Sequence, residues 1–103
     1  MDWQVQGLAT DPAYFSRIEI QHVLIEFDGP RLFTAKTALC TALFMLVDEN
    51  EQNMRFVVTP TDARMVQKLE QGFITVRSAL DQALVWVVET DNAYAASAAW
   101  NTT

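Results

Sequence analysis

The apolar residues of this chain are concentrated between Ile18 and Thr59, where four apolar runs follow one another with only short polar breaks. Within a run, apolar and polar residues tend to alternate, as Met54, Phe56 and Val58 do near the end of the stretch. A period of two residues is typical of strands that bury one face. The stretch therefore predicts a small antiparallel sheet.

Two local features predict where these strands bend and turn. The alternation changes phase between Ile20 and Val23, so we expect a bulge or bend near Gln21-His22. Asp28-Gly29 is a typical hairpin dipeptide, but Pro30 follows it and lacks the N–H that would close a two-residue turn. We therefore expect a wider connection there.

The segment from Leu39 to Val47 is almost wholly apolar and ends at Asp48. Such a segment is typical of a strand covered on both faces, or of one covered on one face and used for association on the other. We expect it at the centre of the sheet.

After Pro60 the period becomes helical. Thr59 is a possible N-cap, Pro60 suits the first helical position, and Asp62 suits the positive end of the helix dipole. Gly72 can end this helix, and Thr75 can cap a second one. The expected apolar stripes are Met65, Val66, Leu69 and Phe73 in the first helix and Val76, Ala79, Leu80 and Ala83 in the second.

A further strand is predicted from Leu84 to Glu89, and the alanine-rich tail from Ala93 to Trp100 is compatible with one or two helical turns. The predicted fold is α+β, an antiparallel sheet of about five strands with two short helices on one face. One domain is expected over residues 1–103. Its parts are an N-terminal arm or turn (1–17), the sheet (18–59), the helices (60–83), a strand (84–90) and the tail (91–103).

Composition and charge narrow the classes of function. The chain has 103 residues, half of them apolar, which is enough for one core but not for two. Thirteen acidic residues against seven basic ones give a formal charge of −6. The electrostatic field of this negative charge repels nucleic-acid phosphate and can instead attract a basic protein. We therefore expect no direct binding of nucleic acid.

Cysteine usage and hydropathy predict the compartment. The single cysteine, Cys40, precludes an internal disulfide, and the start Met1-Asp2-Trp3-Gln4 lacks the basic and then apolar profile of a signal peptide. The longest unbroken apolar stretch, Leu43 to Val47, is far shorter than the roughly 20 residues that a membrane helix needs. We expect a cytoplasmic protein without membrane contact.

Two motifs carry a resemblance. Glu-Phe-Asp-Gly-Pro-Arg-Leu-Phe (Glu26 to Phe33) and Leu-x-x-Gly-x-x-x-x-Arg-x-x-Leu (Leu69 to Leu80), together with the apolar segment that ends at Asp48, resemble a family of small bacterial domains of unknown function. The resemblance covers about residues 22–84. It implies strands followed by helices and a prokaryotic or phage origin, and it assigns no catalytic residue.

Candidate chemical groups are few. His22, the only histidine, has Glu19 and Glu26 near it in sequence, and a histidine beside a carboxylate can act as a general base. No motif of a serine or threonine nucleophile accompanies it. Cys40 lies in an apolar segment, which favours packing over reactivity. Arg77 either pairs with a carboxylate such as Glu26 or stays a surface arginine. Acidic residues that lack the spacing of a calcium loop are Asp28, Asp48, Glu49, Glu51 and Asp62. We predict no catalytic, cofactor-binding or metal-binding residue.

Large aromatic residues and the acidic run point instead to binding of proteins. Tryptophan and tyrosine are enriched among the residues that dominate interface energies, and a domain of this size has little interior in which to bury all of them. The predicted interaction residues are Trp3, Trp86, Tyr94, Trp100, Asp48, Glu49 and Glu51.

Three functions are considered on these grounds. The first is a non-enzymatic protein-interaction domain, either self-associating or a small subunit of a bacterial or phage assembly. The second is an acidic phage-type inhibitor that binds a basic nucleic-acid-binding protein of bacterial immunity, which would need acidic residues gathered on one face. An enzyme is the third, and it would need a pocket that gathers His22 with carboxylates.

Overall fold

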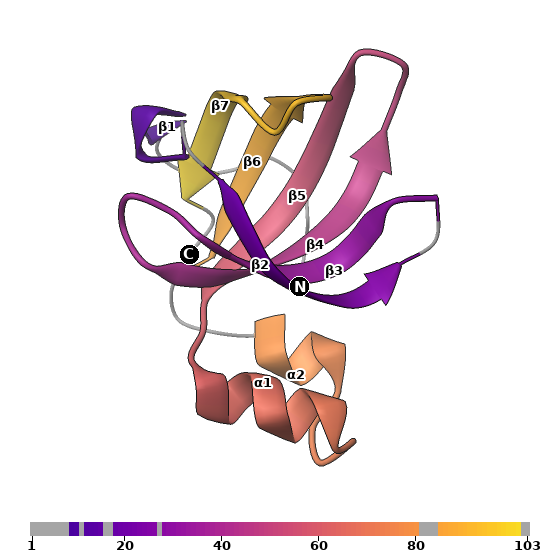
Figure 1. Cartoon of the computed structure of the whole chain (residues 1–103). Coiled ribbons are helices and arrows are strands. Elements are labelled where there is room, and N and C mark those ends of the chain that lie inside the picture. Colours follow the sequence, from indigo (N-terminus) through magenta and orange to yellow (C-terminus); the bar gives the residue numbers. More distant parts are fainter. Residues whose placement is uncertain (1–8, 11, 16–17, 27, 81–84, 102–103) are drawn as a thin grey trace.

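A computed structural model describes residues 9–10, 12–15, 18–26, 28–80 and 85–101. These residues form one antiparallel sheet and three short helices (Figure 1). In chain order the elements are β1 (Ala9–Thr10), the 3-10 helix η1 (Pro12–Phe15), β2 (Glu19–Glu26), β3 (Pro30–Lys36), β4 (Thr41–Glu49), β5 (Asn53–Pro60), α1 (Ala63–Glu70), α2 (Val76–Leu80), β6 (Trp86–Asp91) and β7 (Ala96–Asn101).

The sheet is a meander from β2 to β7, with the strand order β1-β7-β6-β5-β4-β3-β2. Neighbouring strands are antiparallel throughout, and β5 pairs with β6 although both α-helices lie between them in sequence. The N-terminal β1 pairs with the C-terminal β7. The fold class is thus α+β as predicted, but the expected number of about five strands is too low, because the sheet has six longer strands and the two-residue β1.

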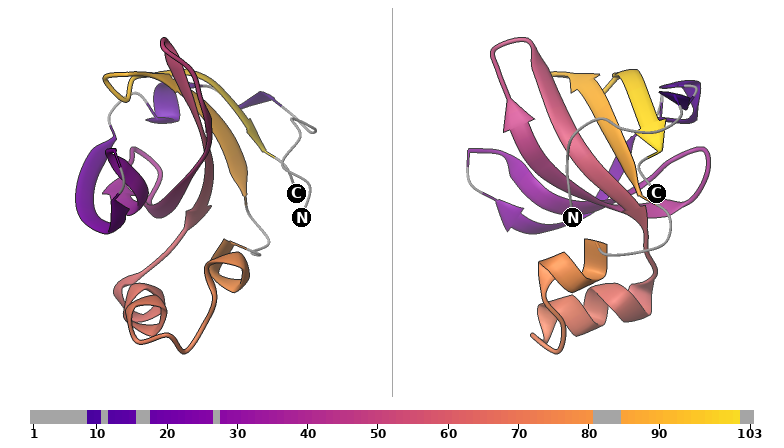
Figure 2. Two further views of the ribbon diagram at one scale, coloured as in Figure 1. Left: turned by 90° about the vertical axis from the view of Figure 1, so that its right-hand side faces the viewer. Right: turned by 180° about the vertical axis from the view of Figure 1, so that it is seen from behind.

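One face of the sheet curls around an aromatic core. Phe33 of β3 stacks on Phe44 of β4 at 5.2 Å between ring centroids, and it also lies 5.5 Å from the ring of Phe56 in β5. Tyr94, from the turn between β6 and β7, contacts Phe33 at 6.1 Å. Strands three positions apart in a flat sheet would be separated by about 14 Å. The sheet is therefore strongly curved around these rings, as both views of Figure 2 show.

The N-terminal arm closes this core. Phe15 of η1 is fully buried and meets Trp86 edge to face at 5.6 Å. Through Phe15 the arm therefore packs against the domain. The arm was expected to be only a loop or turn, however, and its strand β1 extends the sheet beside β7.

The opposite face of the sheet carries the two α-helices, which lie below it in Figure 1. Leu32, Leu43 and Val57 of the sheet form one buried cluster with Ala79 and Leu80 of α2. The partly buried side chains that pack against this cluster include Met65, Leu69, Ile74 and Val76. Burial of this stripe holds α2 in place, since a five-residue helix is not stable by itself.

The strand details predicted from residues 18–59 are mostly confirmed. The pairing of β2 with β3 shifts register between Ile20 and His22, which is the expected bulge. Glu26 pairs with Pro30, so this connection is wider than two residues. β4 is an interior strand buried on both faces, although β5 is the middle strand of the order.

The first α-helix begins later than predicted. Thr59 is fully buried and paired with Leu43, and Pro60 pairs with Ala42, so both belong to β5. Asp62 is the actual N-cap, and its Oδ1 accepts a hydrogen bond from the Met65 N–H at 2.8 Å. Pairing with β4 extends the strand through the first candidate cap, and the next suitable side chain then starts the helix.

Both remaining helix signals are confirmed. Gly72 has φ +74° after the C-cap of α1, and the N–H of Phe73 donates to the Lys68 carbonyl at 2.9 Å. This is the Schellman arrangement, which requires a left-handed residue at the glycine position. Thr75 Oγ1 accepts the Ser78 N–H at 3.1 Å and caps α2.

Phe73 lies beyond the end of α1 and is 75% exposed, so its assignment to the apolar stripe was wrong. Ala83 lies outside the described residues.

The alanine-rich tail was compatible with one or two helical turns, and in the structure it forms the strand β7 (Ala96–Asn101). Asp91 Oδ1 accepts the N–H groups of Ala93 and Ala95, and Tyr94 has φ +63°, so the chain reverses direction after β6. β7 then satisfies the otherwise open edge of β6 through five paired positions. This long-range pairing outweighs the local preference of alanine for helix.

Candidate functional site

The strand β2 forms one edge of the sheet and is the most exposed long element of the fold. Seven of its eight residues are exposed, and in the described part of the chain no strand lies on its outer side. Its apolar side chains Ile20, Val23 and Ile25 are 37%, 38% and 50% exposed. An edge strand presents unpaired N–H and C=O groups, so β2 offers backbone and apolar contacts to a partner.

A hollow of about 650 Å³ lies between β2 and α1. Most of the residues that line it are polar, and we call it the polar hollow, although carbon atoms contribute the larger share of its surface. Its floor includes Thr34 of β3, and its walls carry His22 of β2 and Glu70 of α1. Asp62, Thr61 and Gln67 also line it. The Thr61 Oγ1 atom is buried and has no hydrogen-bond partner among the described residues. The lining includes hydroxyl groups, which can donate or accept, and carboxylates, which can accept.

A second, apolar hollow of about 390 Å³ adjoins the first. Leu24 and Ile25 of β2 face Leu69 of α1 and Val76 of α2, with Leu32 of β3 between them. Glu70 lines both hollows, and its Oε1 lies 3.1 Å from His22 Nε2. We call these two hollows together the β2–α1 groove. It is polar at one end and apolar at the other, with an edge strand along its rim.

The groove brings His22 together with carboxylates, as an enzyme would require. The partner is Glu70, however, and not Glu19 or Glu26, which sequence proximity suggested. Both members of the pair are about half exposed, and among the described residues no hydroxyl group is hydrogen-bonded to the imidazole. A nucleophile needs such a contact to be activated by its base. The geometry supplies a histidine–carboxylate pair without a nucleophile.

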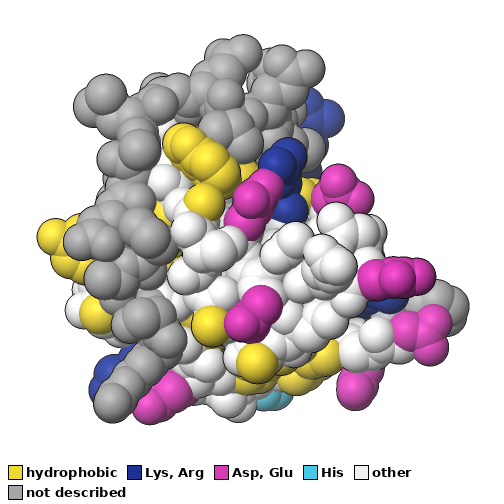
Figure 3. Space-filling view, turned by 90° about the horizontal axis from the view of Figure 1, so that it is seen from above, with side chains coloured by type: hydrophobic (Ala, Val, Ile, Leu, Met, Phe, Trp, Pro, Cys, Tyr) yellow, Lys and Arg dark blue, Asp and Glu magenta, His cyan; other side chains and the backbone are white. Residues whose placement is uncertain are grey.

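A second surface is formed by the hairpin turns. Because the strands alternate in direction, the turns after β2, β4 and β6 lie at one end of the sheet, which Figure 3 shows from above. Seven carboxylates lie at or near these turns, beside two arginines. These residues, which we call the hairpin end, are Glu26, Asp28, Asp48, Glu49, Glu51, Glu89 and Asp91, with Arg31 and Arg55.

Internal pairing neutralises part of the hairpin end. Arg31 Nη1 lies 2.7 Å from Glu49 Oε1, and Arg55 donates to Glu89 through Nε at 3.0 Å and through Nη2. The turns are also tied to one another, since Asn92 donates to the Glu51 carbonyl at 2.8 Å. The other carboxylates of this end form no ion pair among the described residues. The hairpin end therefore keeps a local excess of negative charge.

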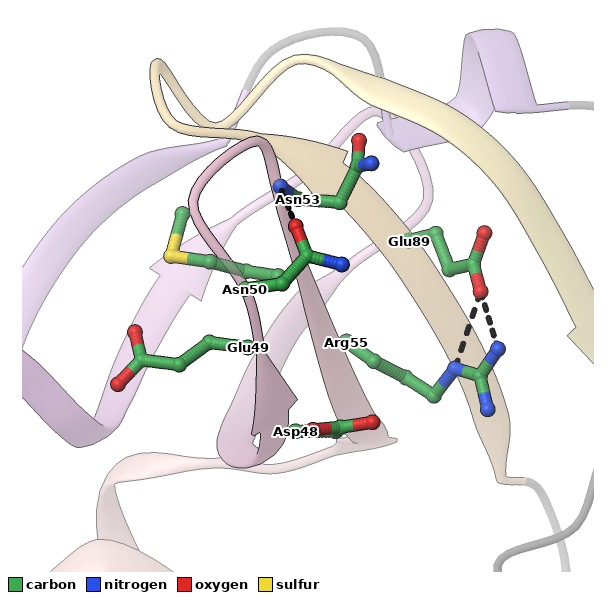
Figure 4. A pocket seen from close by; sticks show the side chains of 7 residues that line it. Asp48, Glu49, Asn50, Asn53, Arg55 and Glu89 are labelled. Atoms are coloured by element: carbon green, nitrogen blue, oxygen red, sulfur yellow. Dashed lines mark hydrogen bonds and ion pairs between the residues drawn. The ribbon is translucent and has the colours of Figure 1, made fainter.

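A small pocket of about 110 Å³ lies within the hairpin end (Figure 4). Arg55 and Glu89 point toward one another, whereas Glu49 points to the opposite side. Asn50 Oδ1 accepts the Asn53 N–H at 2.8 Å and shapes the turn beside it. Two of the three carboxylates that line the pocket, Glu49 and Glu89, are paired with Arg31 and Arg55.

The predicted aromatic interaction residues lie at different depths. Trp86 is 6% exposed and belongs to the core, so its ring has no open surface for a partner. Tyr94 is half-buried and packs on Phe33 and Phe56, and Trp100 is half-buried on β7. Trp3 lies outside the described residues. Among the predicted acidic residues, Asp48, Glu49 and Glu51 are exposed at the hairpin end.

The remaining candidate groups are Cys40, Arg77 and the possible metal ligands. Cys40 is half-buried next to the aromatic core, and burial raises the pKa of its thiol above the ordinary value, with a hydrogen bond from Thr37 acting in the opposite direction. Arg77 is exposed and forms no ion pair among the described residues. In the same residues no three His, Cys, Asp or Glu side chains are grouped as metal ligands, and no helix is long and apolar enough to cross a membrane.

The β2–α1 groove was missed by sequence reasoning. Apolar residues occur at both odd and even positions of β2, namely Ile20, Val23, Leu24 and Ile25, so no register of the strand can bury all of them. This pattern is the available sequence signal for exposed apolar side chains. The partner wall on α1 is supplied from 40 or more residues away and has no such signal.

Comparison with known proteins yields no relative. No family model, curated protein or solved structure matches the chain. The resemblance to a family of small bacterial domains therefore stays a prediction.

Proposed function

We propose that this chain is a non-enzymatic protein-interaction domain that binds through the β2 edge and the β2–α1 groove. The exposure of β2 is the observation that carries this proposal. The opposite edge of the sheet is the two-residue β1, whereas β2 offers eight residues. Natural edge strands are commonly shortened or protected by lysine and proline. β2 contains neither residue, although its bulges bend it.

The apolar side chains on β2 support the same function. Ile25 pairs with Leu32 on the helix face of the sheet and lines the apolar hollow, whereas Ile20 and Val23 pair with Ala35 and Phe33 on the aromatic face. A partner strand would satisfy the backbone of β2 and place its own side chains beside exposed apolar side chains on each face. Binding of this kind fits a small subunit of an assembly, or self-association, without any reaction.

The test uses two lysine substitutions at exposed apolar positions. Ile25→Lys places a charge on the β2 edge, and Leu39→Lys places the same charge at the turn between β3 and β4, where Leu39 is 45% exposed. Tagged full-length variants are used to capture partners from the native host at low and raised salt. Sedimentation velocity measures self-association in parallel.

We expect the wild type and Leu39→Lys to retain the same partner, or the same oligomer, at raised salt. Ile25→Lys should weaken that association at least about tenfold, since it buries an unpaired charge in an apolar contact. Circular dichroism checks that both variants are folded. Equal retention by both variants would show that β2 is not the binding edge.

The hairpin end favours a second candidate, the acidic inhibitor of a basic nucleic-acid-binding protein. This function would need acidic residues gathered on one face of the protein. The hairpin end brings several acidic residues that are scattered in sequence to one end of the sheet. Complementary charge accelerates association and makes it sensitive to salt. The groove remains the stronger basis, because it combines backbone, apolar and polar contacts in one place.

A further inference from the structure

From the lining of the β2–α1 groove we infer the chemistry of the partner: an extended segment that carries a lysine or arginine side chain and an apolar side chain two residues apart. The segment pairs with β2 as an added strand, its cation lies beside Glu70, and its apolar side chain enters the hollow at Leu69. This inference rests on the proposed function and specifies its ligand.

The charge of the groove selects a cation. Among the described residues, no lysine or arginine lines either hollow, although α1 carries Arg64 and Lys68. Glu70 stands where the two hollows meet and is about half exposed, so its carboxylate can accept a second donor besides His22. The chain as a whole has a formal charge of −6, which attracts a basic segment from a distance.

The geometry of an added strand selects the spacing. Side chains of a strand that lie on one face are two residues and about 6.6 Å apart. The polar and apolar hollows adjoin at Glu70, so one face of a strand bound to β2 can supply a side chain to each. In this mode the main-chain hydrogen bonds provide affinity and the alternate side chains provide specificity.

A second copy of β2 fits this edge poorly. Antiparallel pairing about the middle of β2 would set Glu19 of one chain opposite Glu26 of the other, and like charges opposite each other destabilise a strand pair. β2 also lacks any lysine or arginine that could reach Glu70 of the other copy. A basic segment of another protein avoids the repulsion between like charges and supplies the cation that β2 lacks.

The probes are four fluorescent peptides of the sequence Ser-Thr-Val-Thr-X-Thr-Val-Thr-Ser, where X is lysine, arginine, glutamine or glutamate. The valines share a face with X, so each peptide carries the inferred spacing. Binding to the full chain is followed by fluorescence anisotropy at low and physiological salt. Hydrogen exchange of the β2 amides reports whether the peptide lies on this edge.

We expect the lysine and arginine peptides to bind at least about tenfold more tightly than the glutamate peptide and to slow exchange of β2 amides. Glu70→Gln should reduce this preference about fivefold or more. The control Glu51→Gln removes the same charge from the hairpin end and should leave the preference unchanged. This control distinguishes the local effect of the Glu70 carboxylate from the effect of the net charge of the chain.

Binding that ignores the residue at X, equal effects of Glu70→Gln and Glu51→Gln, or no binding of any peptide would overturn the inference. Those results leave the proposed function standing if Ile25→Lys still loses the captured partner while Leu39→Lys keeps it. If Ile25→Lys and Leu39→Lys retain the captured partner equally, the proposed function fails as well. Self-association without peptide binding would identify a second copy as the occupant.

Discussion

Phe33 and Phe73 show how position decides what one side chain contributes. Phe33 is fully buried, and its ring contacts those of Phe44, Phe56 and Tyr94. Phe73 is 75% exposed, because the Schellman turn at Gly72 directs the chain away from the sheet. Helical spacing placed Phe73 in the buried stripe, yet the helix ends at Glu70. The two phenylalanines should therefore differ widely in their effect on stability.

Phe33→Ala should lower the free energy of unfolding by about 3–5 kcal/mol, through lost burial and the cavity that remains. Phe73→Ala should change it by less than about 0.5 kcal/mol. Urea unfolding followed by circular dichroism measures both. Because the first loss could leave little native protein, Phe33→Leu provides a smaller step in the same direction. Similar losses at the two positions would contradict the described core.

At the scale of elements, the helices depend on caps and on the sheet. α1 buries no residue completely, and α2 has only five residues, so neither supplies its own stability. Asp62 caps α1 and also lines the polar hollow, while Leu69 and Val76 bring both helices to the apolar hollow. The second wall of the groove therefore exists only while α1 is docked.

Asp62→Ala should cost about 1 kcal/mol of unfolding free energy, since it leaves the Met65 N–H without its acceptor. Asp62→Asn keeps a side-chain oxygen that can accept the Met65 N–H, so it should retain most of the unfolding free energy that Asp62→Ala loses. Thermal unfolding of the two variants and the wild type makes the comparison. If alanine and asparagine have the same effect, charge or hollow lining matters more than the cap.

At the scale of the whole molecule, the meander places acidic residues that are far apart in the sequence at one end of the sheet. Alternating strand direction brings the turns after β2, β4 and β6 together and places the groove on a different part of the surface. Asp28 and Glu51 are 23 positions apart in sequence and lie in turns at the same end of the sheet. This end and the groove can be tested separately, because their carboxylates are different.

The double variant Asp28→Asn/Glu51→Gln should weaken binding to a ten-residue poly-lysine probe about three- to tenfold, as removal of two exposed charges allows. The logarithm of the association constant should also fall less steeply with the logarithm of salt concentration. Glu19→Gln removes a charge that belongs neither to the hairpin end nor to the lining of the two hollows, and it serves as the control. Weakening of the same size by this control would remove the support for an acidic binding surface at the hairpin end.

Local signals determined the elements in the first two thirds of the chain. Alternation between Ile18 and Thr59, the Asp28-Gly29 turn, Gly72 and Thr75 each act over a few residues, so the sequence by itself predicted strands, turns and helix ends there. These signals also indicated a sheet followed by helices and a net negative surface. They depend on backbone sterics and on the period of each element, which do not require the rest of the fold.

Only the tertiary structure decided the features that join distant segments. β7 became a strand because β6 had an open edge, and Thr59 stayed in β5 because β4 paired with it. The groove needs β2 and α1, and the hairpin end needs three separate turns. Such contacts form between residues far apart in the chain, so no local pattern encodes them. The sites through which we propose that this protein binds its partners belong to this second group.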